Sequence, residues 1–140
     1  MRRLALEVRL LENTAQALQS RINFVNAALT ELRLARMSLE GLEKEKEGSE
    51  LLVHIGGGSY IKTRLETPNV IITGVGADVS IEKTLPQALE NIKGRIEELE
   101  KTSNSLSKQL DQVLSRIAEG RSKLQSMVEE ISSKQRGKIV

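Results

Sequence analysis

The sequence has no cysteine, no tryptophan and only two aromatic residues, Phe24 and Tyr60, in 140 residues. Without cysteine, the chain can form neither a disulfide framework nor a thiolate site. Aromatic rings supply much of the buried area of a globular core. Their scarcity therefore indicates an elongated protein whose apolar residues form a narrow seam.

Long apolar runs are also absent, although a membrane-spanning helix needs about 18 to 20 consecutive apolar residues. The start, MRRLALEVRLL, has basic residues before apolar ones, as signal peptides do. Glu7 and Arg9 interrupt it, and no small-residue cleavage site follows. We therefore expect a cytoplasmic protein with no membrane partner.

Charges of the two signs are nearly balanced and intermixed. Lys and Arg number 21, Asp and Glu number 19, and the net charge is +2. A nucleic-acid-binding protein gathers its basic residues in a stripe or patch. Acidic residues interrupt any such stripe here, so no nucleic-acid partner is expected.

Two long segments carry a heptad pattern, which is typical of coiled-coil helices. The first segment takes its seam from Leu4, Val8, Leu11, Ala15, Leu18, Ile22, Val25, Leu29, Leu32 and Leu39, with Arg36 at one further seam position. The second takes its seam from Leu89, Ile92, Ile96, Leu99, Ser103, Leu106, Leu110, Val113, Ile117, Gly120, Leu124, Met127 and Ile131. We expect an N-terminal helix over residues 1–47, with Gly48 as its stop, and a C-terminal helix over residues 85–136. Pro86, with Thr84 or Leu85 before it, is suited to a helix start, and residues 137–140 are expected to be a tail.

The two helices have similar lengths and are expected to pair antiparallel. One register brings both chain ends together and places Ala15 opposite Gly120, small against small. The same register pairs Leu4 with Ile131, Val8 with Met127, Leu11 with Leu124 and Leu39 with Ile96. Registers shifted by a heptad also fit the pattern, so periodicity alone does not select one.

Residues 48–84 change character: LLVHI, SYIKTRLE, NVIITG and DVSIEKT are β-branched and alternating, as strands are. Between them lie Gly56–Gly58, the segment TPN and the segment GAD. Pro68 cannot donate to a ladder and so marks a junction. The segment is expected to form two β-hairpins with turns at Gly56–Gly58 and Gly76–Asp78.

Neither glycine-rich stretch meets the requirements of a phosphate-binding loop. A Walker loop needs Lys and then Ser or Thr after its last glycine, whereas Ser59 and Tyr60 follow Gly58. The segment GVGADV has Val79 where a dinucleotide fingerprint has its third glycine, and a strand pattern follows it. Glycine favours tight turns because it adopts positive φ without steric cost.

Other residues give no sign of catalysis or metal binding. His54 is the only histidine, and no second nitrogen or thiolate ligand lies near it in the sequence. No nucleophile, base and oxyanion donor can be assembled. We predict no catalytic residue, no metal, no cofactor and no enzymatic activity.

Two short hairpins cannot cover their own faces and edges, and open strand edges invite pairing with another chain. Closing the strands into a barrel with those of partners would remove the edges. The expected fold is therefore α+β: a long antiparallel two-helix coiled coil with two hairpins at one end that join an intersubunit β-barrel.

The layout helix, two hairpins, helix, with ELLVHIGGGSYIKTRL followed by NVIITGVGADVSIEKTLPQALENI, resembles the alpha-class subunit of the prefoldin family. The resemblance covers nearly the whole chain as one domain, 1–140, and is most specific over residues 50–83. His54 stands where the family commonly has Pro. Beta-class subunits have one hairpin, so two hairpins favour the alpha class.

The resemblance implies a hexamer of two alpha-class and four beta-class subunits, which includes a second copy of this chain. Such an assembly holds non-native client proteins at its arm tips without ATP and passes them to a group II chaperonin. The assembly residues expected here are Leu51, Val53, Ile55, Ile61, Leu65, Val70, Ile72, Val79 and Ile81, with Ile61 and Ile72 in the barrel interior. The expected client contacts are Met1, Leu4, Leu6, Val8, Met127, Val128, Ile131, Ile139 and Val140. The basic residues Arg2, Arg3, Lys134, Arg136 and Lys138 would keep this tip soluble and favour acidic clients.

Two other classes of function fit parts of the pattern. A structural coiled-coil scaffold or filament subunit would have the same helices and no affinity for unfolded protein. A nucleic-acid-binding coiled coil would show strongly salt-dependent DNA binding.

Overall fold

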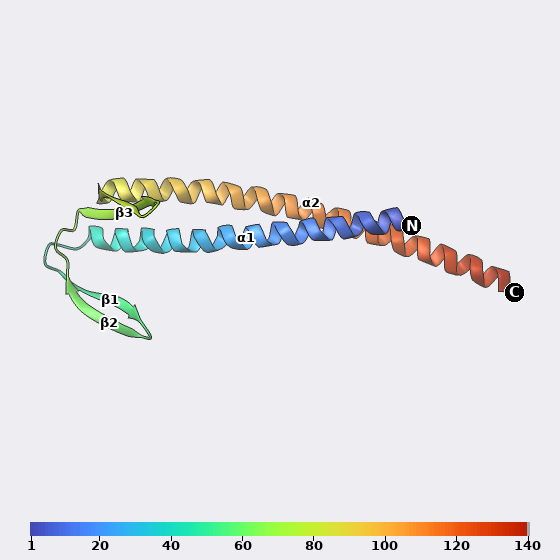
Figure 1. Ribbon diagram of the computed structural model, residues 1–140, viewed down its shortest axis with the longest axis horizontal. Helices are drawn as coiled ribbons and strands as arrows, with labels where there is room; N and C mark the ends of the chain where they lie inside the picture. Colours follow the sequence, from blue (N-terminus) through green and yellow to red (C-terminus); the bar gives the residue numbers. More distant parts are fainter. Residues whose placement is uncertain (140) are drawn as a thin grey trace. The chain divides into compact units, whose positions relative to one another are not determined.

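The computed structural model describes residues 1–139, with side chains as far as Gly137. The elements in chain order are α1 (Arg2–Glu43), β1 (Glu50–Gly56), β2 (Ser59–Arg64), β3 (Val70–Gly76), β4 (Val79–Thr84) and α2 (Leu85–Ile139) (Figure 1).

The chain divides into two compact units. The hairpin unit is Ala28–Leu99 and holds all four strands. The terminal unit is Met1–Ala27 together with the chain from Glu100 onward. In each unit, α1 and α2 run antiparallel, side by side. Over the described residues, neither helix has a stretch long and apolar enough to cross a membrane.

Helix α1 ends at Glu43, four residues before the predicted end at residue 47. Leu42 is the last residue of α1 to pack against the buried cluster of Leu39, Leu85, Ala88 and Leu89. Residues 44–47, KEKE, follow the end of the helix and contain no apolar side chain that could be buried. Packing of an apolar face supplies most of a helix's stability in a protein, so α1 stops where that packing stops.

Helix α2 begins at Leu85, where the sequence predicted a start. The backbone N–H of Gln87 donates to Thr84 Oγ1 (3.3 Å), and the backbone N–H of Thr84 donates to Gln87 Oε1 (3.2 Å). This reciprocal pair is a capping box, which satisfies two donors at the helix start. At the other end, α2 reaches Ile139, beyond the predicted end at residue 136. Gly137 lies inside this helix, although glycine costs about 1 kcal/mol there relative to alanine.

The helix register in the terminal unit differs by one heptad from the predicted one. A Cβ built on Gly120 would lie 2.6 Å from Cγ2 of Val8, so Gly120 faces Val8 and not Ala15. One polar contact agrees with this register: Ser103 Oγ donates to Asn26 Oδ1 (3.2 Å). The long side chain of Arg121 also reaches across the helix pair, with Nη2 2.6 Å from Oε1 of Glu12.

The hairpin unit shows the same shift, because Leu39 clusters with Leu85 and Leu89 rather than with Ile96. The residues of both helices that the heptads assign to the seam are buried or half-buried from Leu4 to Leu124. The seam was thus predicted correctly over this range, but its offset was wrong, and Met127 and Ile131 fall outside it. Heptads repeat, so an offset of seven residues keeps the same residues on the seam side of each helix wherever the two helices overlap. A glycine opposite a β-branched valine fits where two larger residues would not.

The shift separates the two chain ends, contrary to the prediction that they meet. In the terminal unit, α2 continues past the start of α1 (Figure 1). Met127 and Ile131, which were expected in the seam opposite Val8 and Leu4, are therefore 37% and 45% exposed. Val8 is 6% exposed and lies in the seam.

Both hairpins have the predicted turns. The central residues Gly57 and Gly58 have φ of 57° and 75°, and Ala77 and Asp78 have φ of 49° and 60°. Positive φ at both central residues is what a type I′ hairpin turn requires. Each strand before the turn carries an irregularity, between His54 and Gly56 and between Gly74 and Gly76.

The contact between Val8 and Gly120 predicts how the arm responds to added volume. Gly120→Ala should gain up to about 1 kcal/mol in helix propensity but lose about 1–3 kcal/mol to overpacking against the stiff side chain of Val8. We expect net destabilisation in urea unfolding followed by circular dichroism. In a Val8→Ala background, the same Gly120→Ala change should stabilise the chain. Stabilisation by Gly120→Ala in both backgrounds would show that Val8 does not face Gly120.

Candidate functional site

All four strands have an unused edge in the described chain. β1 pairs only with β2 and β3 only with β4, both antiparallel, and the two pairs form separate two-stranded sheets. An isolated two-stranded ribbon is marginally stable in water, and its free N–H and C=O groups are a template for another strand. The hairpin unit therefore offers two ready surfaces for association with other chains.

The β1–β2 hairpin carries apolar side chains on both faces. One face holds the cross-strand pairs Val53–Ile61 and Leu51–Thr63, as the alternation in SYIKTRLE predicted. Thr63 Oγ1 donates to the carbonyl of Leu51 across the ribbon (3.3 Å). The remaining member of this face is Ile55, and Val53, Ile55 and Ile61 are all exposed. A contiguous exposed apolar face of this kind marks an interaction site.

The opposite face of the same hairpin holds Leu52 paired with Lys62 and His54 paired with Tyr60. The rings of His54 and Tyr60 meet edge to face with centroids 5.2 Å apart, an arrangement that stabilises cross-strand neighbours. His54 thus contacts Tyr60 across the ribbon and remains exposed. Leu52 and Tyr60 are exposed apolar residues that the sequence analysis left out of the assembly set.

Backbone hydrogen bonds fasten the β1–β2 hairpin at its base. The N–H of Gly48 donates to the carbonyl of Leu65 (2.6 Å), and the N–H of Leu65 donates to the carbonyl of Ser49 (2.9 Å). Leu65 is half-buried and lies after the end of β2. Leu65, which was predicted to be an assembly residue, therefore lies at the base of the hairpin and not on its apolar face.

The β3–β4 hairpin divides its predicted assembly residues between two faces. The register pairs Val70 with Thr84 and Ile72 with Glu82 on one face, and Thr73 with Ile81 on the other. Val79 shares the face of Ile81, because alternate residues of β4 lie on the same side. The predicted residues fall on two faces because the pairing of β3 with β4 is fixed by the two-residue turn at Ala77 and Asp78 and by the irregularity between Gly74 and Gly76.

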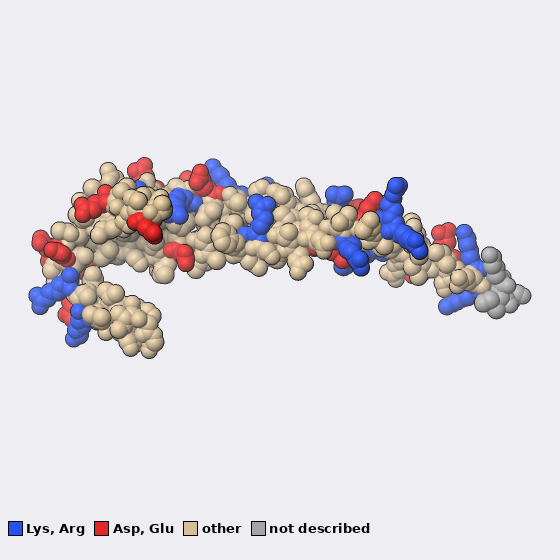
Figure 2. All heavy atoms as spheres, viewed as in Figure 1, with Lys and Arg blue, Asp and Glu red and all other residues tan. Residues whose placement is uncertain are grey.

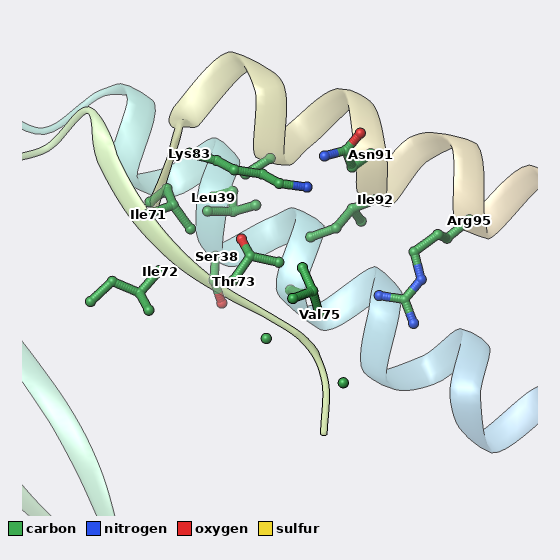
Figure 3. A pocket seen from close by; sticks show the side chains of 14 residues that line it. Ser38, Leu39, Ile71, Ile72, Thr73, Val75, Lys83, Asn91, Ile92 and Arg95 are labelled. Carbon is green, nitrogen blue, oxygen red and sulfur yellow. The ribbon is translucent and has the colours of Figure 1, made fainter. Parts of the chain in front are cut away.

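One face of this hairpin looks toward the helices. Ile71, Thr73 and Val75 lie on the helix side of β3 in Figure 3, and Ile72 points away from it. Ile71 packs against the buried cluster that contains Leu39 and Leu85. Ile72 is 72% exposed. Ile71 and Val75 were not among the predicted residues, because NVIITGVG is apolar on both faces and alternation alone does not say which face meets a helix.

A groove of about 910 Å³ remains between β3 and the helices of the hairpin unit. Leu39 and Ile92 supply apolar walls from α1 and α2, and Lys83 and Arg95 lie at its margin (Figure 3). The hairpin is further tied to the start of α2 by the N–H of Leu85, which donates to the carbonyl of Asn69 (3.2 Å). Hairpin β3–β4 is thus partly covered by its own chain, whereas β1–β2 stands away from the helices (Figure 1).

The predicted client contacts fall into three groups. Met1, Leu6, Met127, Val128 and Ile131 are exposed, whereas Leu4 is half-buried and Val8 is buried in the seam. Val140 and the side chain of Ile139 lie outside the described residues. The exposed residues of α2 lie beyond the last half-buried seam residue, Leu124. They are accessible without any fraying of the helix pair.

Nothing in the described part of the chain resembles a metal centre, because no group of three His, Cys, Asp or Glu residues is placed to hold an ion. The features that remain are open strand edges and exposed apolar side chains on hairpins and helix. Open strand edges and exposed apolar surface are typical of sites that contact other protein chains.

The chain was compared with known proteins. The family model for prefoldin, described as "Prefoldin subunit", matches residues 11–131. Prefoldin subunit alpha of Pyrococcus horikoshii is 31% identical over 128 residues, which cover 91% of this chain and 86% of the relative. Prefoldin subunit alpha of Thermofilum pendens is 28% identical over 84% of this chain and 91% of the relative. A cryo-EM structure of filamentous PFD from Methanocaldococcus jannaschii is similar in fold, with a TM-score of 0.64 at 24% identity over 88% of this chain and 96% of that one.

The two faces of β3 predict opposite outcomes for two matched substitutions. Ile71→Ala should destabilise the chain by about 1–2 kcal/mol, because it removes a half-buried side chain from the helix cluster. Ile72→Ala, on the solvent side, should change the free energy of unfolding by less than about 0.5 kcal/mol. Urea titration of both variants measures the difference. Equal effects would mean that β3 does not present Ile71 to the helices.

Proposed function

Because the chain belongs to the prefoldin family, we propose that it is an ATP-independent chaperone subunit that assembles through its hairpins, captures non-native proteins and delivers them to a group II chaperonin. The family consists of chaperone subunits and not of enzymes, and the matched relatives carry the alpha-class name. The observation that carries the assembly step is the set of four strands with an unused edge each.

We propose that beta-class subunits and a second copy of this chain supply the missing strands, in a hexamer of two alpha-class and four beta-class subunits. The exposed face of Val53, Ile55 and Ile61 would then turn into the barrel interior, where burial of apolar area stabilises the assembly. The family match spans both compact units, which supports one functional domain over the chain. We place this activity in the cytoplasm.

Client capture, in this proposal, uses the part of α2 that lies beyond the seam. Met127, Val128 and Ile131 form an exposed cluster on consecutive turns of the helix. Non-native proteins expose apolar segments, and each buried side chain contributes about 1.5–3 kcal/mol before the cost of ordering. One such cluster binds weakly. Several arms closing on one client bind more strongly through their high effective concentration.

The assembly step is tested by charge on one face of β1–β2. Ile61→Asp should prevent assembly with beta-class subunits, because it would bury an unpaired carboxylate in the barrel. Ile61 is exposed in the single chain, so circular dichroism should still show the helices. Lys62→Asp, on the opposite face at a charged side chain that is 80% exposed, is the control and should leave assembly nearly unchanged. If size-exclusion chromatography finds an intact hexamer for Ile61→Asp, this face is not part of the interface between subunits.

The capture step is tested by changing Met127, Val128 and Ile131 together to Gln, which has a good helix propensity. We expect an intact assembly that suppresses aggregation of a denatured protein less effectively than the parent. The control is Leu114→Gln, an exposed leucine elsewhere on α2. Undiminished protection by the triple variant would exclude this cluster as a main client contact. Absence of protection by the parent assembly would favour a purely structural coiled-coil scaffold.

A further inference from the structure

Helix α1 has a second apolar stripe, outside the seam. In the terminal unit it consists of Leu6, Leu10, Ala17 and Phe24, at spacings of four, seven and seven residues, which place them on one side of a helix. All four are exposed, and Phe24, the only phenylalanine of the chain, is 78% exposed. The outer face of a two-helix coiled coil is normally polar. The stripe is therefore an exposed apolar surface at a place where polar side chains are usual.

The surface beside Phe24 is hollowed. A groove of about 350 Å³ runs between α1 and α2 there, lined by Ser20, Arg21, Phe24, Val25, Thr102 and Leu106. Its floor is apolar, since Leu106 is buried and Val25 lies in the seam. One rim carries the guanidinium of Arg21. The groove offers an apolar side chain of a bound chain a place to insert, next to a positive charge.

The charge of the terminal unit favours one kind of occupant. This unit has twelve Lys and Arg residues against seven Asp and Glu, whereas the hairpin unit has nine against twelve. Along the stripe, Arg3 lies three positions before Leu6, and Arg21 lies three positions before Phe24. Glu12, one of only two acidic residues before position 28, is paired with Arg121. On the face shown in Figure 2, Lys and Arg side chains predominate over the terminal unit, and acidic ones gather over β3–β4 and the start of α2.

We propose that this stripe, together with the Phe24 groove, binds acidic, apolar segments of non-native proteins. The inference rests on the proposed chaperone function and specifies the client class and a contact surface on α1, separate from the α2 cluster. A second copy of the terminal unit would bring the same positive surplus to the stripe, and like charges oppose that contact. An acidic segment supplies both the apolar side chains and the opposite charge.

The test uses the full chain and two fluorescein-labelled peptides of equal length with identical apolar residues. One peptide has Asp and Glu at its other positions, and the second has Lys. Anisotropy titrations should show tighter binding of the acidic peptide, with the preference shrinking as salt is added. The variant Leu6→Gln, Leu10→Gln, Phe24→Gln should bind the acidic peptide about tenfold more weakly, and Arg21→Gln should reduce the charge preference. The control is the double variant Leu34→Gln, Met37→Gln, which changes two exposed residues of α1 in the hairpin unit. This variant should bind the acidic peptide as tightly as the parent does.

Three results would overturn the proposal: equal affinity for the two peptides, unchanged affinity of the stripe variant, or no binding of either peptide by the parent. Loss of self-association in the stripe variant, measured by sedimentation, would instead assign the stripe to a second copy. These outcomes are independent of the aggregation assay with the α2 cluster. Protection that depends on Met127, Val128 and Ile131 while the peptides fail to bind would leave the chaperone function standing and refute only this surface.

Discussion

A strand in a sheet has two hydrogen-bonding edges, and each of the four strands of this chain uses one. The unused backbone groups are the constraint that organises the rest of the hairpin unit. Two separate ribbons cannot bury their faces or complete their ladders within the chain, although β3–β4 obtains partial cover from the helix cluster around Leu39 and Leu85. β1–β2 has no such cover, and apolar residues are exposed on both of its faces. Partner strands would complete both ribbons, which connects the backbone geometry directly to the subunit role of the family.

The helices obey a different constraint, because their one seam must be filled without clashes. Gly120 lies opposite Val8, where a glycine leaves room for the valine side chain, and this contact marks the offset of the two helices along the seam. The offset in turn decides which apolar residues are left exposed. Met127 and Ile131 fit the heptad pattern and are exposed because of this offset. The offset thereby determines where the terminal unit presents apolar surface.

Much of this was predictable from the sequence, for physical reasons that differ between elements. The glycine turns followed from the need for positive φ, the start of α2 from Thr84 and Pro86, and the membership of the seam from heptad spacing. The family resemblance was confirmed by the match over residues 11–131. The offset of the helices was not predictable, since heptads repeat and registers shifted by seven residues fit the pattern equally well. The faces of β3–β4 were also missed, because NVIITGVG has apolar residues on both faces and gives no alternation to read. The exposed stripe with Phe24 was visible in the sequence as apolar residues off the seam, but only burial showed that nothing covers it.

The central claim is that the open hairpins of this chain are completed by strands of other subunits. Native mass spectrometry of the full chain, alone and mixed with beta-class prefoldin subunits, tests it most directly. The account predicts a discrete hexamer with two copies of this chain and four beta-class subunits, and loss of that species on Ile61→Asp. A chain that stays monomeric in the presence of beta-class subunits would contradict it, as would a hexamer that forms equally well with Ile61→Asp.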